Sequence, residues 1–139
     1  MDFTGKVVVI TGASSGIGEA LVYAFADRGA KVVMGARNSA KLAEIAAQLF
    51  TRGIESAFEA TDVTREEDCK RLIDKALSAF GRIDILICNA GISMRALFDD
   101  VQLDVLRQLM DVNFWGTVYC AKYALPALQA AKGTLVGVS

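Results

Sequence analysis

The stretch that decides the fold is residues 6–21, KVVVITGASSGIGEAL. It opens with an unbroken apolar run at residues 7–10, which is typical of a strand buried on both faces. Glycines follow at positions 12, 16 and 18, and the pattern from Glu19 onward is helical. The first turn of such a helix has unpaired backbone N–H groups and the positive end of the helix dipole, so it can seat a phosphate.

Each of the three glycines has its own expected role. Gly12 allows a tight turn off the strand, Gly16 removes a Cβ that would keep a pyrophosphate from the backbone, and Gly18 lets helix and strand pack closely. A glycine-rich turn can be an ordinary connection, but the buried strand before it and a second strand from Lys31 favour dinucleotide binding. No Gly-Lys-Ser/Thr follows, which excludes the phosphate loop of nucleotide triphosphatases.

Composition narrows the class of protein. The 139 residues are 53% apolar and carry a net charge of −1, so we expect one domain, residues 1–139, without an electrostatic reason to bind nucleic acid. Histidine is absent, and Cys69, Cys88 and Cys120 have no metal-ligand spacing, so we expect no metal site. No segment predicts membrane insertion or secretion, and we expect a cytoplasmic protein with buried thiols.

Strands and helices alternate along the chain, which predicts parallel βαβ units. We expect strands at residues 6–11, 31–36, 55–60, 84–88 and 134–138. The first helix is expected to turn Ile17, Leu21, Ala24 and Phe25 inward, Ser39 to cap the second, and a capping box at residues 64–67 to begin the third. A helical pattern with a break near Asn113 precedes the last strand. The predicted fold is a doubly wound α/β sheet (Rossmann fold) in three layers, with strand order 3-2-1-4-5, truncated after the fifth strand.

In open parallel sheets the ligand lies beyond the carboxyl ends of the strands. Arg37 follows the second strand, where an NAD site carries a carboxylate for the ribose 2′-hydroxyl, and its guanidinium can pair with a 2′-phosphate. An arginine before a helix can also be merely solvated, but its position favours the functional interpretation. Asp62 follows the third strand and can accept from the adenine amine, or it can be a turn aspartate; the two interpretations are equally supported.

The segments TGASSGIG (residues 11–18), DV (62–63), NAGI (89–92) and DVN (111–113) resemble the short-chain dehydrogenase/reductase superfamily. The resemblance implies an oxidoreductase of alcohols or carbonyls that uses NADP, with NAD less favoured because of Arg37. It implies that Asn89 lies beside the cofactor ribose and that Asn113 is a catalytic residue anchoring a water in a proton relay. Asn113 can alternatively have a purely structural role, as an asparagine at a break in a helix. The expected cofactor-binding residues are Gly12, Ser14, Ser15, Gly16, Ile17, Gly18, Arg37, Asp62, Val63, Asn89, Ala90 and Gly91.

One departure from the family pattern is large. The catalytic serine and Tyr-x-x-x-Lys pair are not found, and Ser139 aligns with the residue before that serine. Tyr119 and Tyr123 are followed four positions on by Tyr123 and Ala127, so we expect both to be packing residues. We therefore expect an inactive cofactor-binding fragment of an enzyme that acts on a small-molecule alcohol or carbonyl substrate. The alternatives are a non-catalytic module that binds or senses NADP(H) and, less favoured, an interaction scaffold.

Two apolar surfaces predict a homo-oligomer. The strand at residues 134–138 is expected to be an exposed edge without protective charges or prolines. The helix before it is expected to expose a face comprising Phe114, Val118, Ala121, Tyr123 and Leu125. We expect self-association through the strand, the helix face, or both.

Overall fold

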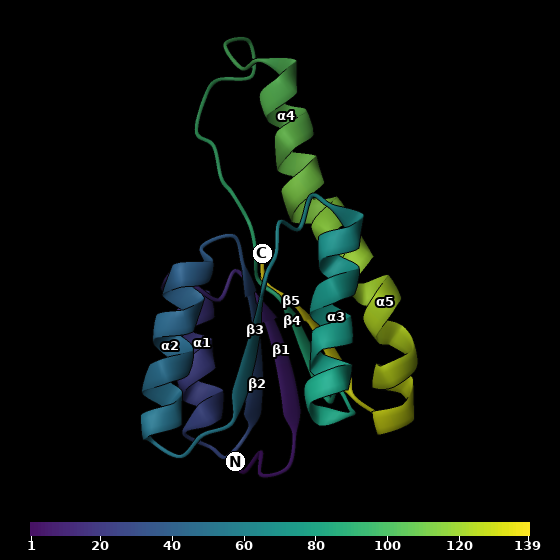
Figure 1. Cartoon of the computed structure of the whole chain (residues 1–139). Helices are drawn as coiled ribbons and strands as arrows, with labels where there is room; N and C mark the ends of the chain where they lie inside the picture. The colour runs from purple at the N-terminus through teal and green to yellow at the C-terminus, as the bar shows by residue number, and fades with distance from the viewer.

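The protein is built around one five-stranded parallel sheet, seen in a computed structural model that describes residues 1–139 (Figure 1). The strands are β1 (Val7–Thr11), β2 (Lys31–Ala36), β3 (Ser56–Ala60), β4 (Ile85–Cys88) and β5 (Thr134–Gly137). Their order is β3-β2-β1-β4-β5, so the predicted topology is confirmed. Each strand lies within the predicted range, and the ranges differ by at most one residue at either end.

Helices cover both faces of the sheet and make the predicted three layers (Figure 1). They are α1 (Gly16–Ala26) and α2 (Ser39–Thr51) on one face, and α3 (Glu66–Phe80) and α5 (Gly116–Ala131) on the other. The core has two parts, one between the sheet and each helical layer. Every residue of β1 is buried, as expected for the central strand of a parallel sheet covered on both faces.

The inward face of α1 differs from the prediction. Gly18, Val22 and Ala26 are its buried residues, whereas Ile17, predicted to point inward, is 62% exposed. The cause is the close approach of Gly18 to the β1–α1 turn. A helix that buries position 18 also buries positions 22 and 26, one turn and two turns further on.

The caps of α2 and α3 are also different from those predicted. Asn38, and not Ser39, caps α2, because its Oδ1 accepts a hydrogen bond from Lys41 N–H at 3.1 Å. The capping box at residues 64–67 does not form. The N–H and the hydroxyl of Thr64 both donate to Asp62 Oδ1, at 3.0 and 2.7 Å. A capping hydroxyl accepts a hydrogen bond from a backbone N–H of the first helical turn. The Thr64 hydroxyl is instead turned toward Asp62 as a donor, so Thr64 closes a turn and does not cap the helix.

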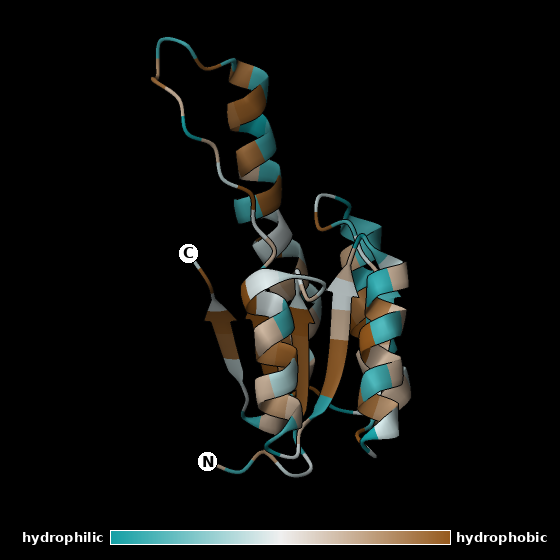
Figure 2. Cartoon of the chain, turned by 90° about the vertical axis from the view of Figure 1, so that its left-hand side faces the viewer, coloured by the Kyte–Doolittle hydropathy of each residue, from teal (hydrophilic) through white to brown (hydrophobic).

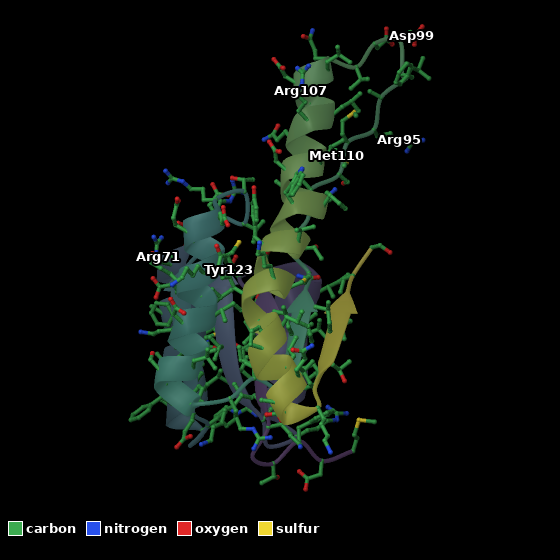
Figure 3. The ribbon with its side chains drawn as sticks, turned by 90° about the vertical axis from the view of Figure 1, so that its right-hand side faces the viewer. Arg71, Arg95, Asp99, Arg107, Met110 and Tyr123 are labelled. Atoms are coloured by element: carbon green, nitrogen blue, oxygen red, sulfur yellow. The ribbon has the colours of Figure 1, made fainter.

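An arm projects beyond the carboxyl ends of the strands (Figures 1 and 2). It consists of an irregular segment that follows β4 and then α4 (Leu103–Met110), which has no buried residue. Arg95, Asp99, Arg107 and Met110 lie on this arm (Figure 3). The predicted helix break near Asn113 is a π-helical turn, η1 (Asp111–Trp115), and Pro126 lies inside α5 without ending it.

The exposed apolar face predicted for the helix before β5, which here comprises η1 and α5, is confirmed only in part. Phe114 and Leu125 are about half exposed, at 48% and 50%. Tyr123 instead points toward α3 and donates a hydrogen bond to Glu66 Oε1 at 2.7 Å (Figure 3). Tyr119 and Tyr123 both pack against the core on this side, as predicted. β5 is exposed along its whole length and forms a largely apolar edge (Figure 2).

Asp84 joins the amino-terminal ends of the central strands. Its buried carboxylate accepts from Val7 N–H at 2.9 Å and from Arg82 Nε and Nη2 at 2.8 and 2.6 Å. Burial alone would raise the pKa of Asp84, but the hydrogen bonds from Arg82 and Val7 outweigh it and hold the pKa below its usual value.

The three cysteines are buried and unpaired, which confirms the prediction of buried thiols. Burial raises the pKa of the Cys88 thiol to about 11. The neighbouring Cys69 thiol, together with burial, raises the pKa of Cys120. No group of three cysteine, aspartate or glutamate side chains is arranged to hold a metal ion. None of the helices combines the length and the apolar character needed to cross a bilayer.

Candidate functional site

A groove of about 690 Å³ lies at the carboxyl ends of the strands, where the sequence places the ligand. Segments from four strand ends and from the base of the arm line it. Its lining residues are Gly12, Ser14, Ser15, Ile17, Ala36, Arg37, Asn38, Thr61, Asp62, Val63, Thr64, Asn89, Ala90, Gly91, Ile92, Gln108, Asp111 and Val112. Most of the predicted cofactor-binding residues are therefore brought together. Gly16, Gly18 and Asn113 are not among the lining residues.

The β1–α1 turn depends on its glycines in different ways. Gly12 and Gly16 have φ values of +64° and +56°, which favour glycine. A Cβ on Gly18 would collide with Gly12 O and would lie 2.6 Å from Asn89 Nδ2, whereas a Cβ on Gly16 would meet nothing within 4 Å. Gly18 therefore serves packing and Gly16 leaves open space in front of the helix. The first N–H groups of α1 have no intrahelical acceptors and face that space.

A reciprocal hydrogen-bond pair holds the ends of β1 and β4 together. Thr11 Oγ1 accepts from the N–H groups of Asn89 and Ala90, both at 3.0 Å. In return, Asn89 Nδ2 donates to the carbonyl oxygens of Thr11 and Gly12, at 3.2 and 3.3 Å. These contacts fix the glycine-rich turn relative to Ala90 and Gly91. Thr11 was not among the predicted site residues, although a hydroxyl at the end of a buried strand was a signal for it.

The far end of the groove carries charged groups of both signs. Arg37 is exposed and follows β2, and Asp62 follows β3. The hydrogen bond from the Thr64 hydroxyl holds the pKa of Asp62 below its usual value, and the positive charges of Arg37 and Arg65 act in the same direction. Asp62 is therefore ionised at neutral pH, and one of its oxygens is free of Thr64.

Asn113 ties the π-helical turn to the strand-end loop. Its Oδ1 accepts from Ile92 N–H at 2.9 Å, and its Nδ2 donates to Ile92 O at 2.8 Å. The amide oxygen and the amide nitrogen each retain one further hydrogen-bonding position. A Cβ on Gly91 would lie 3.2 Å from Asn113 Oδ1, so this glycine allows the close approach. The structure thus places Asn113 directly behind Gly91 and Ile92.

Gln108 and Asp111 also line the groove. Gln108 was not predicted from the sequence, and Asp111 was noted only as part of the DVN segment and not as a groove residue. They lie at the base of the arm, where α4 meets η1. The irregular segment before α4 gives no periodic signal, so its sequence does not show which helical residues return to the strand ends.

Comparison with known proteins identifies the family of this chain. The family model described as short chain dehydrogenase matches residues 6–139. The chain is 43% identical to an 11-beta-hydroxysteroid dehydrogenase A of Sesamum indicum, over 99% of this chain and 40% of that protein. It is 44% identical to an 11-beta-hydroxysteroid dehydrogenase A of Arachis hypogaea, over 97% of this chain and 39% of that protein.

Solved structures agree with the family match. An alcohol dehydrogenase from the archaeon Thermococcus sibiricus, complexed with 5-hydroxy-NADP, superposes with a TM-score of 0.92 at 32% identity, covering 95% of this chain and 57% of that one. The KRED1-Pglu enzyme superposes with a TM-score of 0.90 at 36% identity, covering 96% and 56%. Fold and groove define a nucleotide-binding Rossmann domain. The chain belongs to the short-chain dehydrogenase family of oxidoreductases and spans between 38% and 46% of the length of the curated relatives.

Proposed function

We propose that the chain forms the cofactor-binding part of an NADP(H)-dependent oxidoreductase that interconverts an alcohol and a carbonyl. The observation that carries the choice of NADP(H) is that the groove residue just after β2 is Arg37 and not an aspartate or glutamate. An ionised carboxylate at that position would repel a 2′-phosphate, whereas a guanidinium can hold it with charge-assisted hydrogen bonds.

The residues present fit such a cofactor. The open space in front of Gly16 and the free N–H groups of α1 can receive the pyrophosphate. Asp62 and Val63 would border the adenine, and residues 89–91 would border the nicotinamide ribose; all of them line the groove. When bound, the nicotinamide donates or accepts a hydride. The residues of this chain bind and orient it, and Asn113, braced by Ile92, holds a water on the proton path with its remaining hydrogen-bonding positions.

The named activities of the relatives support the substrate class. They are hydroxysteroid dehydrogenases, and one structural neighbour is an alcohol dehydrogenase. From these names we extend to this chain only a small-molecule substrate that carries an alcohol or a carbonyl group. We also propose a cytoplasmic location and a homo-oligomer.

A second candidate is a module that binds NADP(H) without chemistry. It rests on the observation that none of the three tyrosines in these 139 residues has a lysine four positions later. Both candidates require the same groove, so cofactor binding is tested first and turnover second.

Calorimetric titration of the chain with NADPH and with NADH tests the proposal. A hydrogen bond to a charged group contributes about 1.5–3 kcal/mol, so NADPH is expected to bind at least tenfold more tightly. Arg37→Ala is expected to remove most of this preference. Arg28→Ala, at the far end of α1, is the matched control and is expected to leave both affinities unchanged. Equal affinities in the unsubstituted chain, or an unchanged ratio in Arg37→Ala, would refute the choice of NADP(H).

A further inference from the structure

The edge strand β3 presents backbone groups that have no partner in the sheet. β3 pairs only with β2. Val32 N–H donates to Glu55 O at 3.4 Å and Thr61 N–H to Ala36 O at 2.8 Å, so the odd-numbered residues of β3 face β2. The N–H and C=O groups of Ser56, Phe58 and Ala60 therefore point outward. The strand contains no proline and one charged residue, so this edge has little of the usual protection against pairing.

A groove of about 710 Å³ runs beside this edge. Most of its lining is apolar and comes from the second half of α2, the start of β3 and the end of α3. Ala47, Phe50, Ile54, Ser56 and Phe80 are among its lining residues. Phe50 is 81% exposed. An aromatic ring that is left in water beside an unpaired strand edge favours a protein partner at this surface.

The outer face of α2 continues the same surface. Ala40, Ala43, Ala47 and Phe50 are all exposed and are spaced by three, four and three residues, so they lie on one face of the helix. α2 packs mainly over β3, which places this face close to the sheet edge. The surface thus combines an extended backbone with a helix that bears one large side chain and three small ones.

We propose that this surface, comprising the outer edge of β3 and the outer face of α2, binds a second copy of the chain. A twofold axis perpendicular to the sheet at Phe58 would pair Phe58 with Phe58 of the second copy and Ser56 with its Ala60. All three outward-pointing residues would then gain hydrogen-bond partners in an antiparallel ladder.

The same rotation makes the helices complementary. It places α2 antiparallel to α2 of the second copy. If the axis passes beside Ile45, Phe50 faces Ala40 of the second copy and Ala47 faces its Ala43. A large ring then meets a small side chain at each end of the contact. Paired strands lie about 4.8 Å apart and helices about 8–10 Å apart, with small side chains at the lower end, so both contacts fit one axis when α2 lies slightly inside the edge. This match of the surface to itself favours a second copy over an unrelated peptide.

Charge and area are compatible with this pairing. Lys31 pairs with Glu55 at 2.8 Å and Arg71 with Glu59 at 3.8 Å, so the edge carries no excess of one sign that would repel an identical edge. The 13-residue α2 is about 20 Å long, and three layers are about 30 Å thick, which gives roughly 600 Å² per copy. Stable interfaces bury about 800 Å² per partner, so we expect a reversible dimer and not a permanent one.

Sedimentation equilibrium from micromolar to millimolar concentration tests the proposal on the chain itself. We expect a monomer–dimer equilibrium whose dissociation constant rises at least tenfold in Ala43→Lys and in Ser56→Pro. Proline at Ser56 removes one outward N–H and leaves the ladder with β2 intact. Ala130→Lys, at an exposed alanine of α5, is the matched control and is expected to leave the constant unchanged. Circular dichroism confirms that each variant is folded.

A second readout needs no variant. Amide hydrogen exchange of Ser56, Phe58 and Ala60 is expected to slow as the protein concentration rises, while that of residues 57 and 59, already bonded to β2, does not change. A monomer throughout the range, or concentration-independent exchange at these three amides, would overturn the proposal. A dimer that Val136→Lys dissociates and Ala43→Lys does not would also overturn it, because the contact would then lie at β5.

Discussion

Replacing Gly18 with alanine tests the packing on which the glycine-rich turn depends. The new Cβ would collide with the carbonyl of Gly12 and would lie 2.6 Å from Asn89 Nδ2. Overpacking costs about 1–3 kcal/mol, and contact with rigid backbone favours the upper end of that range. Losing the Asn89–Gly12 hydrogen bond adds about 1 kcal/mol, which the better helix propensity of alanine offsets by about 1 kcal/mol. We expect a loss of about 3 kcal/mol in the free energy of unfolding.

Gly16→Ala is the matched variant. Its Cβ would meet nothing, so only the positive φ is penalised, by about 1–2 kcal/mol. Urea denaturation followed by far-ultraviolet circular dichroism, without cofactor, measures both free energies. The reasoning would be refuted by a loss under 0.5 kcal/mol for Gly18→Ala, or by a larger loss for Gly16→Ala. In titrations with NADPH, Gly16→Ala is expected to weaken binding because its methyl group occupies the space in front of α1.

Three further predictions concern other parts of the molecule. The pKa of Asp84 is lower in the folded protein than in the unfolded chain, so the contribution of Asp84 to the free energy of unfolding is complete above the unfolded pKa of about 4 and is lost as pH falls through the folded pKa. Asp84→Asn is therefore expected to flatten the acid side of a curve of stability against pH, and an unchanged curve would contradict this. The Cys88 thiol, with a pKa of about 11, is expected to resist iodoacetamide at pH 8 until urea is added, and labelling in the folded state would show the site to be open. The chain is expected to oxidise no NADPH with ketones or aldehydes, because it lacks a tyrosine–lysine pair for proton transfer; turnover by protein free of contaminating reductases would disprove this.

The fold was predictable because its signals are local and strong. Continuous apolar runs predict buried parallel strands, and the residues that follow them must meet at one edge of the sheet. Arg37, Asp62 and Asn89 each follow a strand, so the sequence predicted that they line one groove. Finer features depend on contacts between segments that periodicity does not describe. The inward face of α1 follows from the approach of Gly18 to Gly12, and the lost capping box follows from Asp62 competing for Thr64.

The arm could not be predicted from the sequence for a different reason. Its irregular segment carries no periodicity, and α4 buries nothing, so neither its direction nor the arrival of Gln108 at the groove could be read from the sequence. Tyr123 was assigned to the exposed face of α5 by spacing alone. The hydrogen bond to Glu66, which turns it toward α3, joins residues far apart in the chain.

The central claim is that the groove at the strand ends binds a dinucleotide phosphate. A titration of the 15N-labelled chain with NADPH, followed in 1H–15N correlation spectra, tests it most directly. We expect the largest shifts at the amides of Gly16 and Gly18, which lead α1, with further shifts at Arg37, Asp62 and Gly91. Absence of shifts at millimolar NADPH, or shifts confined to α5 and β5, would contradict the account.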